Sequence, residues 1–166
     1  IDTDGNLWSW GYNASGNLGL NLTTNVTIPA KTTFNTQVIK VSTSIGANNS
    51  ATSLILLEDK SIRGAGYNVE CQLSQSNLSN SSVFVRILKQ NGNDLTDIED
   101  IYAASGSGTC FAIDTDGNLW SFGYGGYGFG DSRTGNSQMA SIVLENIQSI
   151  VTSANANTRT FAKLKN

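Results

Sequence analysis

The sequence predicts an all-β protein made of three repeated units, each containing four short strands. Three observations support this fold class: the composition, a nine-residue segment that occurs twice, and turn signals followed by aromatic strands. The chain of 166 residues has 17 glycines and only 14% charged residues, a composition that provides many turns and little helix-forming material. Helix-forming residues such as Glu, Lys and Ala are nowhere concentrated with a period of 3.6 residues, which an amphipathic helix would require.

The segment IDTDGNLWS is identical at 1–9 and 113–121. A degenerate copy begins at Leu56, so the three copies start 55 and then 57 residues apart. A nearly fixed period of this kind indicates a repeat architecture. We expect repeat units that span approximately 1–55, 56–112 and 113–166.

Each unit contains the signals of four strands. An Asp-Gly pair, at 4–5 and 116–117, predicts a two-residue type I′ hairpin turn, in which both central residues need positive φ. The segments 7–10 and 119–122 that follow are rich in aromatic residues, as strands are. A spaced apolar pair and a further strand complete the unit. Four strands in about 55 residues match the size and content of a β-propeller blade.

Several residues recur at positions that the repeat itself explains, and we expect them to have structural roles. They are Gly5, Trp8, Trp10, Gly11, Gly16, Gly66, Gly117, Trp120, Gly123 and Gly128. The aromatic residues at 8, 10, 120 and 122 favour packing between neighbouring blades, because each buries much apolar area. An aromatic platform for a ligand is the alternative. The second unit has Arg63 in place of the first tryptophan, so we expect its packing or its surface to differ.

The loop WGYNASGNLG at 10–19 resembles the repeat of the regulator-of-chromosome-condensation (alpha-tubulin suppressor-like) family. The second unit keeps this pattern but has Cys71 where the loop glycine belongs, and the third, at 122–130, is one residue shorter with Phe129 in place of the leucine. The resemblance implies a β-propeller, usually of seven blades, that grips another protein with one face or edge.

The resemblance also implies a non-catalytic module for protein–protein interaction. Two alternatives stay open: a structural scaffold component of a larger assembly, and a guanine-nucleotide exchange factor for a small GTPase. The chain begins and ends inside a hairpin, so we expect further propeller blades or another chain to complete the split hairpins. Three blades favour a piece of a longer propeller, with assembly between chains as the alternative.

Four tyrosines are candidates for a partner-binding rim, because loops on a rigid scaffold often carry recognition and tyrosine is favoured in interfaces. They are Tyr12, Tyr67, Tyr124 and Tyr127. The first three directly follow the glycine that ends a strand in each unit. Packing of these tyrosines against the next blade is the alternative.

The composition disfavours several other functions. The chain has no histidine, which excludes a His-dependent triad or a His-ligated zinc site within it. Its carboxylates show no catalytic spacing, so we predict no enzyme activity, no cofactor and no metal. The segment 2–6 lacks the ligand spacing of a calcium loop, and a hairpin turn explains it. The net charge of −3 without a basic cluster disfavours nucleic acid, and no apolar run is long enough to cross a membrane.

The cysteines and the sequons leave the compartment open between extracellular and cytoplasmic. Cys110 lies in an apolar segment typical of a buried strand, where a free thiol acts as a small hydrophobe. A disulfide to Cys71 is the alternative. Six Asn-x-Ser/Thr sequons are close to the number that chance gives, so they do not establish secretion. They begin at Asn13, Asn21, Asn25, Asn48, Asn77 and Asn80.

Overall fold

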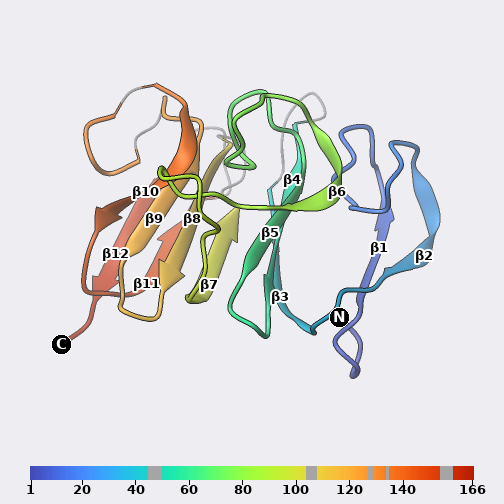
Figure 1. The fold of residues 1–166 in the computed structure, drawn as a ribbon, viewed down its shortest axis with the longest axis horizontal. Helices are drawn as coiled ribbons and strands as arrows, with labels where there is room; N and C mark the ends of the chain where they lie inside the picture. Colours follow the sequence, from blue (N-terminus) through green and yellow to red (C-terminus); the bar gives the residue numbers. More distant parts are fainter. Residues whose placement is uncertain (45–49, 104–107, 127–128, 134, 154–158) are drawn as a thin grey trace.

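The computed structural model of the chain describes residues 1–44, 50–103, 108–126, 129–133, 135–153 and 159–166. These residues form twelve β-strands and no helix, which confirms the all-β class. The strands are β1 (Leu7–Gly11), β2 (Val26–Thr32), β3 (Val38–Thr43), β4 (Thr52–Leu57), β5 (Ile62–Gly66), β6 (Ser81–Arg86), β7 (Ile98–Ala103), β8 (Thr109–Asp114), β9 (Leu119–Gly123), β10 (Ser137–Leu144), β11 (Ile147–Thr152) and β12 (Thr160–Leu164). They pair antiparallel into four sheets that stand side by side (Figure 1).

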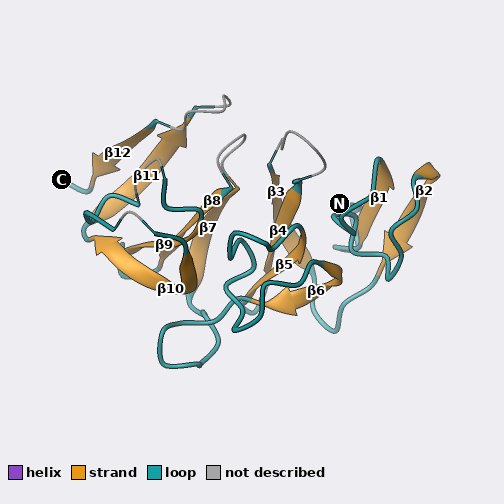
Figure 2. Cartoon of the chain, turned by 90° about the horizontal axis from the view of Figure 1, so that it is seen from above, coloured by secondary structure: helices purple, strands orange, loops and turns teal. Residues whose placement is uncertain are grey.

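Two of the sheets are complete four-stranded blades and two are half-blades. The first blade has the strand order β3-β4-β5-β6 and the second blade β7-β8-β9-β10, while β1-β2 form an N-terminal half-blade and β11-β12 a C-terminal half-blade. Twelve strands equal the three blades that the repeat predicts, divided into two complete blades and two halves. Seen from above, the sheets spread like the segments of a fan, with the outer strands β6 and β10 on the same side (Figure 2).

The hairpin turns differ from the type I′ turns that the Asp-Gly pairs predict. Asp2 N donates to Asn6 O at 3.0 Å and Gly5 N donates to Asp2 O at 3.1 Å, so the loop has three residues. Gly5 has a φ of 77°, but Asp4 is not among the residues with positive φ. This is a tight turn followed by a left-handed glycine. The prediction of a type I′ turn was wrong because the carboxylate of Asp2 accepts hydrogen bonds from the Asp4 and Asn6 amides and thereby holds the longer loop.

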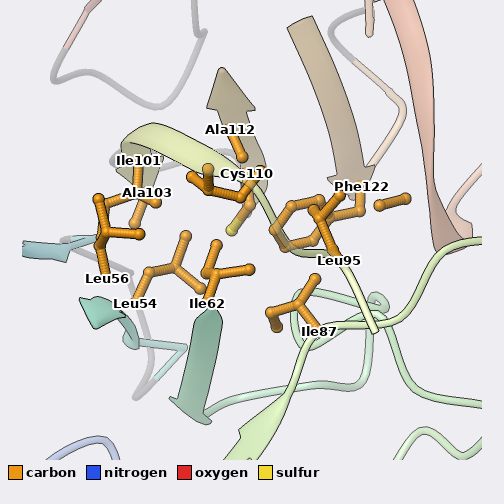
Figure 3. Close-up of a cluster of buried hydrophobic side chains, with 12 residues drawn as sticks. Leu54, Leu56, Ile62, Ile87, Leu95, Ile101, Ala103, Cys110, Ala112 and Phe122 are labelled. Carbon is orange, nitrogen blue, oxygen red and sulfur yellow. The ribbon is translucent and has the colours of Figure 1, made fainter. Parts of the chain in front are cut away.

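The hydrophobic core lies between the sheets rather than within any one of them. Every residue of β4 and of β8 is buried, because each of these strands faces a sheet on both sides. The largest cluster joins the first blade to the second blade and includes Leu54, Leu56, Ile62, Cys110 and Phe122 (Figure 3). Two smaller clusters join each half-blade to its neighbouring complete blade. The blades are therefore held together by apolar contacts between sheets.

The repeated aromatic residues have different surroundings in the two halves of the chain. Phe122 is fully buried between the two complete blades, and Trp120 packs against the same cluster. Trp8 and Trp10 lie on the N-terminal half-blade and are 40% and 58% exposed.

Within the part of the chain that the structure describes, no helix could cross a membrane.

Both cysteines are free and buried, so the alternative of a disulfide between them is not realised. Burial raises the pKa of the Cys110 thiol to about 12. Its place in the core between the blades is that of a small hydrophobe, as the sequence predicts.

Candidate partner-binding surface

The loops that follow β1, β5 and β9 lie at the same end of the sheets, at the top of Figure 1. Each begins with a rim tyrosine: Tyr12 is 52% exposed, while Tyr67 and Tyr124 are partly buried. Tyr127 and the repeat position Gly128 lie outside the described residues. The structure therefore places three of the four candidate tyrosines on one face, which we call the loop face.

The backbone of the tyrosines ties the loops to the inner hairpins. Tyr67 N donates to Ala51 O at 3.0 Å, and Thr52 Oγ1 donates to Tyr67 O at 2.8 Å. The second blade repeats this arrangement, since Thr109 Oγ1 donates to Tyr124 O at 2.7 Å. The start of each of these loops is thus fixed on the sheet below it.

A buried asparagine organises the loop of the first blade. Asn68 is fully buried, accepts a hydrogen bond from Leu73 N at 2.8 Å and donates from Nδ2 to Asn77 O at 2.8 Å. Its own amide donates to Asn80 Oδ1 at 2.9 Å. Asn13 makes the equivalent contacts in the N-terminal half-blade. Because Asn13 is buried in these bonds, its sequon is inaccessible in the folded chain.

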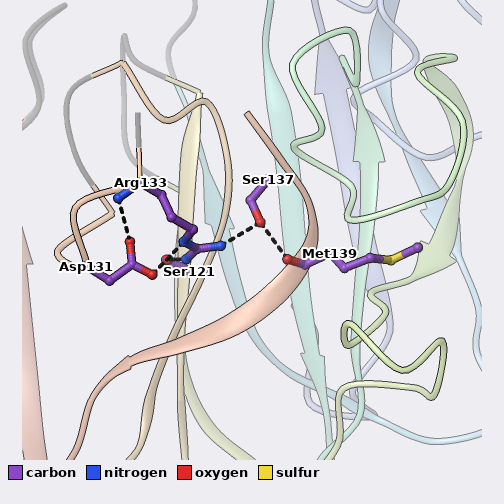
Figure 4. Close-up of polar contacts among 5 residues, drawn as sticks. All are labelled: Ser121, Asp131, Arg133, Ser137 and Met139. Carbon is purple, nitrogen blue, oxygen red and sulfur yellow. Dashed lines mark hydrogen bonds and ion pairs between the residues drawn. The ribbon is translucent and has the colours of Figure 1, made fainter. Parts of the chain in front are cut away.

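The second blade has Gly125 where the asparagine would stand, and an arginine organises its loop instead (Figure 4). Arg133 donates from Nη2 to Ser121 Oγ at 3.0 Å and from Nη1 to Ser137 Oγ at 2.8 Å, and it forms an ion pair with Asp131. Its guanidinium also stacks 4.5 Å from the centre of the Phe129 ring. This cluster is not predicted from the sequence, although Gly125 in place of the asparagine after Tyr124 indicates that another residue organises the loop.

A groove runs between the loops of the first and second blades. It has a volume of about 610 Å³. Its lining comprises Val69, Cys71, Leu78, Gln90, Arg133, Gly135, Asn136, Ser137, Gln138 and Met139. Val69 and Leu78 are 49% and 47% exposed, so the apolar wall faces solvent. Of the rim tyrosines that the structure describes, Tyr12, Tyr67 and Tyr124, none lines the groove. The sequence alone did not reveal this groove.

The lining of the groove combines apolar side chains with amide side chains. Gln90, Asn136 and Gln138 are exposed and can each donate and accept a hydrogen bond. Burial and the charge of Glu70 raise the pKa of the Cys71 thiol, which keeps it protonated and unreactive at neutral pH. Among the described residues no group of three potential metal ligands occurs. The lining thus offers apolar contacts and hydrogen-bonding amides.

The chain matches known repeat proteins in sequence. A family model described as the regulator of chromosome condensation (RCC1) repeat matches residues 4–51. Protein RCC2 of Homo sapiens is 33% identical over 128 residues, and the RCC2 homolog of Danio rerio is 30% identical over 128 residues. Each match covers 77% of this chain but only 23% and 24% of those proteins. The chain therefore spans about a quarter of the length of the curated relatives it matches.

Solved structures share the fold. Yeast RCC1 (Prp20) bound to Kap60 superposes with a TM-score of 0.77 at 14% identity, covering 99% of this chain and 39% of that chain. Human WBSCR16 gives a TM-score of 0.67 at 17% identity, covering 86% of this chain and 34% of that one. At these identities the likeness shows a shared fold alone. Taken with the repeat match and the RCC2 relatives, it shows that this chain belongs to the RCC1-like repeat family.

Proposed function

We propose that this chain is a non-catalytic interaction module that binds an extended segment of another protein in the groove of the loop face. The observation that carries the proposal is the groove itself, whose lining contains the half-exposed Val69 and Leu78 together with three amide side chains. An extended peptide offers alternating backbone donors and acceptors to amides and apolar side chains to such a wall. A small molecule would be held better by a site whose apolar residues were enclosed.

The fold neighbours support protein partners in general terms. Yeast RCC1 (Prp20) was solved bound to Kap60, and a second structure of Prp20p concerned its binding properties to Gsp1p and histones. At identities of 14% and 15%, these structures share the fold of this chain, and the partners are those of Prp20. The absence of a catalytic constellation among the described groove residues supports a binding role over an enzymatic one.

Peptide selection on the intact chain tests the proposal. A random dodecapeptide display library would be selected against immobilised protein, and the enriched peptides measured by fluorescence anisotropy. We expect Leu78→Glu, in the groove, to weaken binding about tenfold or more. Ile39→Glu adds the same charge at a residue of β3 that is 47% exposed and does not line the groove, and it should bind like the wild type. Failure to enrich any peptide, or equal binding by both variants, would overturn the proposal.

The scaffold role is a second candidate because β1 and β12 have one partner strand each, whereas their equivalents in the complete blades have two. Within the described residues β1 pairs only with β2, and β12 pairs only with β11. We propose that further blades or another chain pair with these strands, which natural sheets do not leave exposed. For guanine-nucleotide exchange, we find no supporting residue cluster among the residues that the structure describes. Measuring nucleotide release from a panel of small GTPases tests it, and acceleration by this chain would revive it.

A further inference from the structure

One cross-strand pair of the first blade consists of two arginines. Arg63 on β5 lies directly opposite Arg86 on β6. At the same position of the other two units, a tryptophan faces a lysine or an isoleucine. Like charges directly opposite each other destabilise an antiparallel pair, so the two arginines need negative charge beside them.

Only one of these two arginines has an ion-pair partner among the described residues. Arg86 Nη1 lies 3.0 Å from Asp94 Oδ2. Arg63 forms no ion pair in the part of the chain that the structure describes, and its Nε is buried without a hydrogen-bond partner. A buried donor needs an acceptor, because burial removes it from water. Arg63 is therefore the residue that lacks a partner.

The equivalent residues of the other two units have the acceptor that Arg63 lacks. Trp8 and Trp120 each donate from Nε1 to the aspartate that begins their own hairpin turn, at 2.8 Å in both units. In the first blade Leu57 stands at the position of that aspartate. The exchange of the tryptophan for an arginine and of the aspartate for a leucine thus leaves a positive charge without the carboxylate that the repeat provides elsewhere.

The two arginines line a cleft of about 220 Å³ beside the β4–β5 turn. This turn precedes β5, so the cleft lies at the end of the sheets opposite the loop face and is separate from the groove (Figure 1). The lining comprises Asp59, Ser61, Ile62, Arg63, Arg86, Asp94, Leu95 and Thr96. Ile62 and Leu95 are fully buried, so the polar groups of the cleft have an apolar support.

The two carboxylates of the cleft already have partners. Asp94 pairs with Arg86, and Asp59 Oδ1 accepts hydrogen bonds from Ser61 N at 3.0 Å and Ser61 Oγ at 2.6 Å. The pKa of Asp59 lies below its usual value, first because of these bonds and to a lesser extent because of the charge of Arg63. A ligand with a single negative charge fits this balance, whereas a doubly charged phosphate would be repelled more strongly by both carboxylates.

We infer that this cleft binds a carboxylate group through the guanidinium of Arg63. A carboxylate accepts two parallel hydrogen bonds from a guanidinium, which would give Nε the acceptor that the tryptophans find in their aspartates. The carboxylate belongs either to a free carboxylic acid or to an acidic side chain of a polypeptide, because both present the same group. The inference does not depend on peptide binding in the groove of the loop face.

Nuclear magnetic resonance titration of the isotope-labelled full chain tests the inference, because the Nε–H group of Arg63 gives a signal of its own. The probes are sodium acetate, a capped tripeptide Gly-Glu-Gly and the neutral capped tripeptide Gly-Gln-Gly. We expect the Arg63 signal to shift in a saturable way with acetate and with the glutamate peptide, but not with the glutamine peptide. Tighter binding of the glutamate peptide than of acetate identifies a polypeptide side chain as the ligand, and the reverse identifies a free acid.

Matched variants separate the guanidinium from the rest of the cleft, with binding followed at the backbone amides of Ser61 and Thr96. Arg63→Gln should weaken acetate binding about tenfold or more. Arg159→Gln removes the same charge at an exposed residue that does not line the cleft, and it should bind like the wild type. Asp59→Asn should tighten binding about threefold, because it removes a like charge beside the ligand.

The same spectra show whether each variant is folded, since a folded β-protein keeps well-dispersed amide signals. The inference is wrong if neither acetate nor the glutamate peptide shifts the Arg63 signal, or if Arg63→Gln binds acetate like the wild type. Tighter binding of inorganic phosphate than of acetate would also overturn it, and so would weaker acetate binding by Asp59→Asn.

Discussion

The turns of the two complete blades have the same backbone but different side chains. In the β8–β9 turn, Asp114 N donates to Asn118 O and Gly117 N donates to Asp114 O, both at 3.0 Å. In the β4–β5 turn, at 57–61, the two equivalent bonds are also 3.0 Å long. The fourth residue is left-handed in both, with a φ of 88° at Gly117 and 65° at Lys60. The shape of the turn therefore persists although its sequence does not.

The side chains that stabilise the β8–β9 turn are replaced together in the β4–β5 turn. Asp114 accepts hydrogen bonds from Trp120 Nε1 at 2.8 Å and from Asn118 N at 2.8 Å. The β4–β5 turn has neither partner, since Leu57 replaces the aspartate and Arg63 replaces the tryptophan. Leu57 is instead buried in the cluster against the N-terminal half-blade. The β8–β9 turn is held by the hydrogen bonds of Asp114 with Asn118 and Trp120, which we call the polar clamp. The β4–β5 turn is held by the core packing of Leu57.

The two turns show that the repeat keeps the same turn backbone while the side-chain interactions that stabilise it differ together. Asp59 provides a local substitute, because its carboxylate accepts hydrogen bonds from Ser61 N at 3.0 Å and from Ser61 Oγ at 2.6 Å. These bonds lower the pKa of Asp59. Four variants can break or sharpen the comparison.

The largest expected effect is that of Gly117→Val, which disfavours the left-handed backbone conformation that both turns share. A β-branched residue resists the positive φ, and its Cβ would lie 3.2 Å from Ile147 O. We expect a loss of about 3 kcal/mol in the free energy of unfolding, measured by urea denaturation. Glu99→Ala, on the exposed side of β7, should change it by less than about 0.5 kcal/mol. Equal stability of the two variants would refute the proposed role of the glycine.

Next in size is Asp114→Ala, which removes the polar clamp and leaves the turn backbone in place. The carboxylate accepts from Asp116 N, Asn118 N, Asn118 Nδ2 and Trp120 Nε1. Losing these partners should cost about 2 kcal/mol. Asp59→Ala, at an exposed carboxylate of the other turn, should cost less than about 1 kcal/mol. If thermal unfolding shows a larger loss of stability for Asp59→Ala than for Asp114→Ala, the proposed difference between the two turns is wrong.

A smaller effect is expected in the acid dependence of stability. Burial alone would raise the pKa of Asp114, but the hydrogen bonds from Trp120 and Asn118 outweigh it and the pKa lies below its usual value. The unfolded pKa is about 3.9, so this stabilisation is complete above that pH and is lost as the pH falls towards the folded pKa. Asp114→Asn should therefore lose less stability than the wild type between about pH 4.5 and pH 3. If the free energies of unfolding of the two proteins fell in parallel with pH, the proposed role of the Asp114 carboxylate would be wrong.

The repeat made the fold predictable, because spacing and strand signals reflect the backbone that the copies share. The sequence therefore predicted blades of four strands and the buried position of Cys110. It did not predict the three-residue turns, since the Asp-Gly signal says nothing about a carboxylate that lies two residues earlier. Nor did it predict the groove or the cluster around Arg133, because these arise from contacts between loops of different blades. The exposure of Tyr12 and the partial burial of Tyr67 and Tyr124 leave the partner-binding role of the rim a prediction.

The smallest expected effect is a gain, from replacing Lys60 by glycine. Lys60 is exposed and holds a φ of 65°, which costs an L-residue about 1–2 kcal/mol, whereas glycine adopts it freely. Its backbone bonds, from Lys60 N to Leu57 O and from Ile98 N to Lys60 O, need no side chain. The greater freedom of glycine in the unfolded chain offsets part of the gain, so we expect Lys60→Gly to stabilise the chain by about 0.5 kcal/mol. Glu58→Gly, two residues earlier in the same exposed turn and without positive φ, has only the entropic cost and should destabilise it. Stability changes of opposite sign for Lys60→Gly and Glu58→Gly would show that the repeat preserves the left-handed position rather than the Asp-Gly sequence. A loss of stability in both variants would show that Leu57 and its core contacts alone hold this turn.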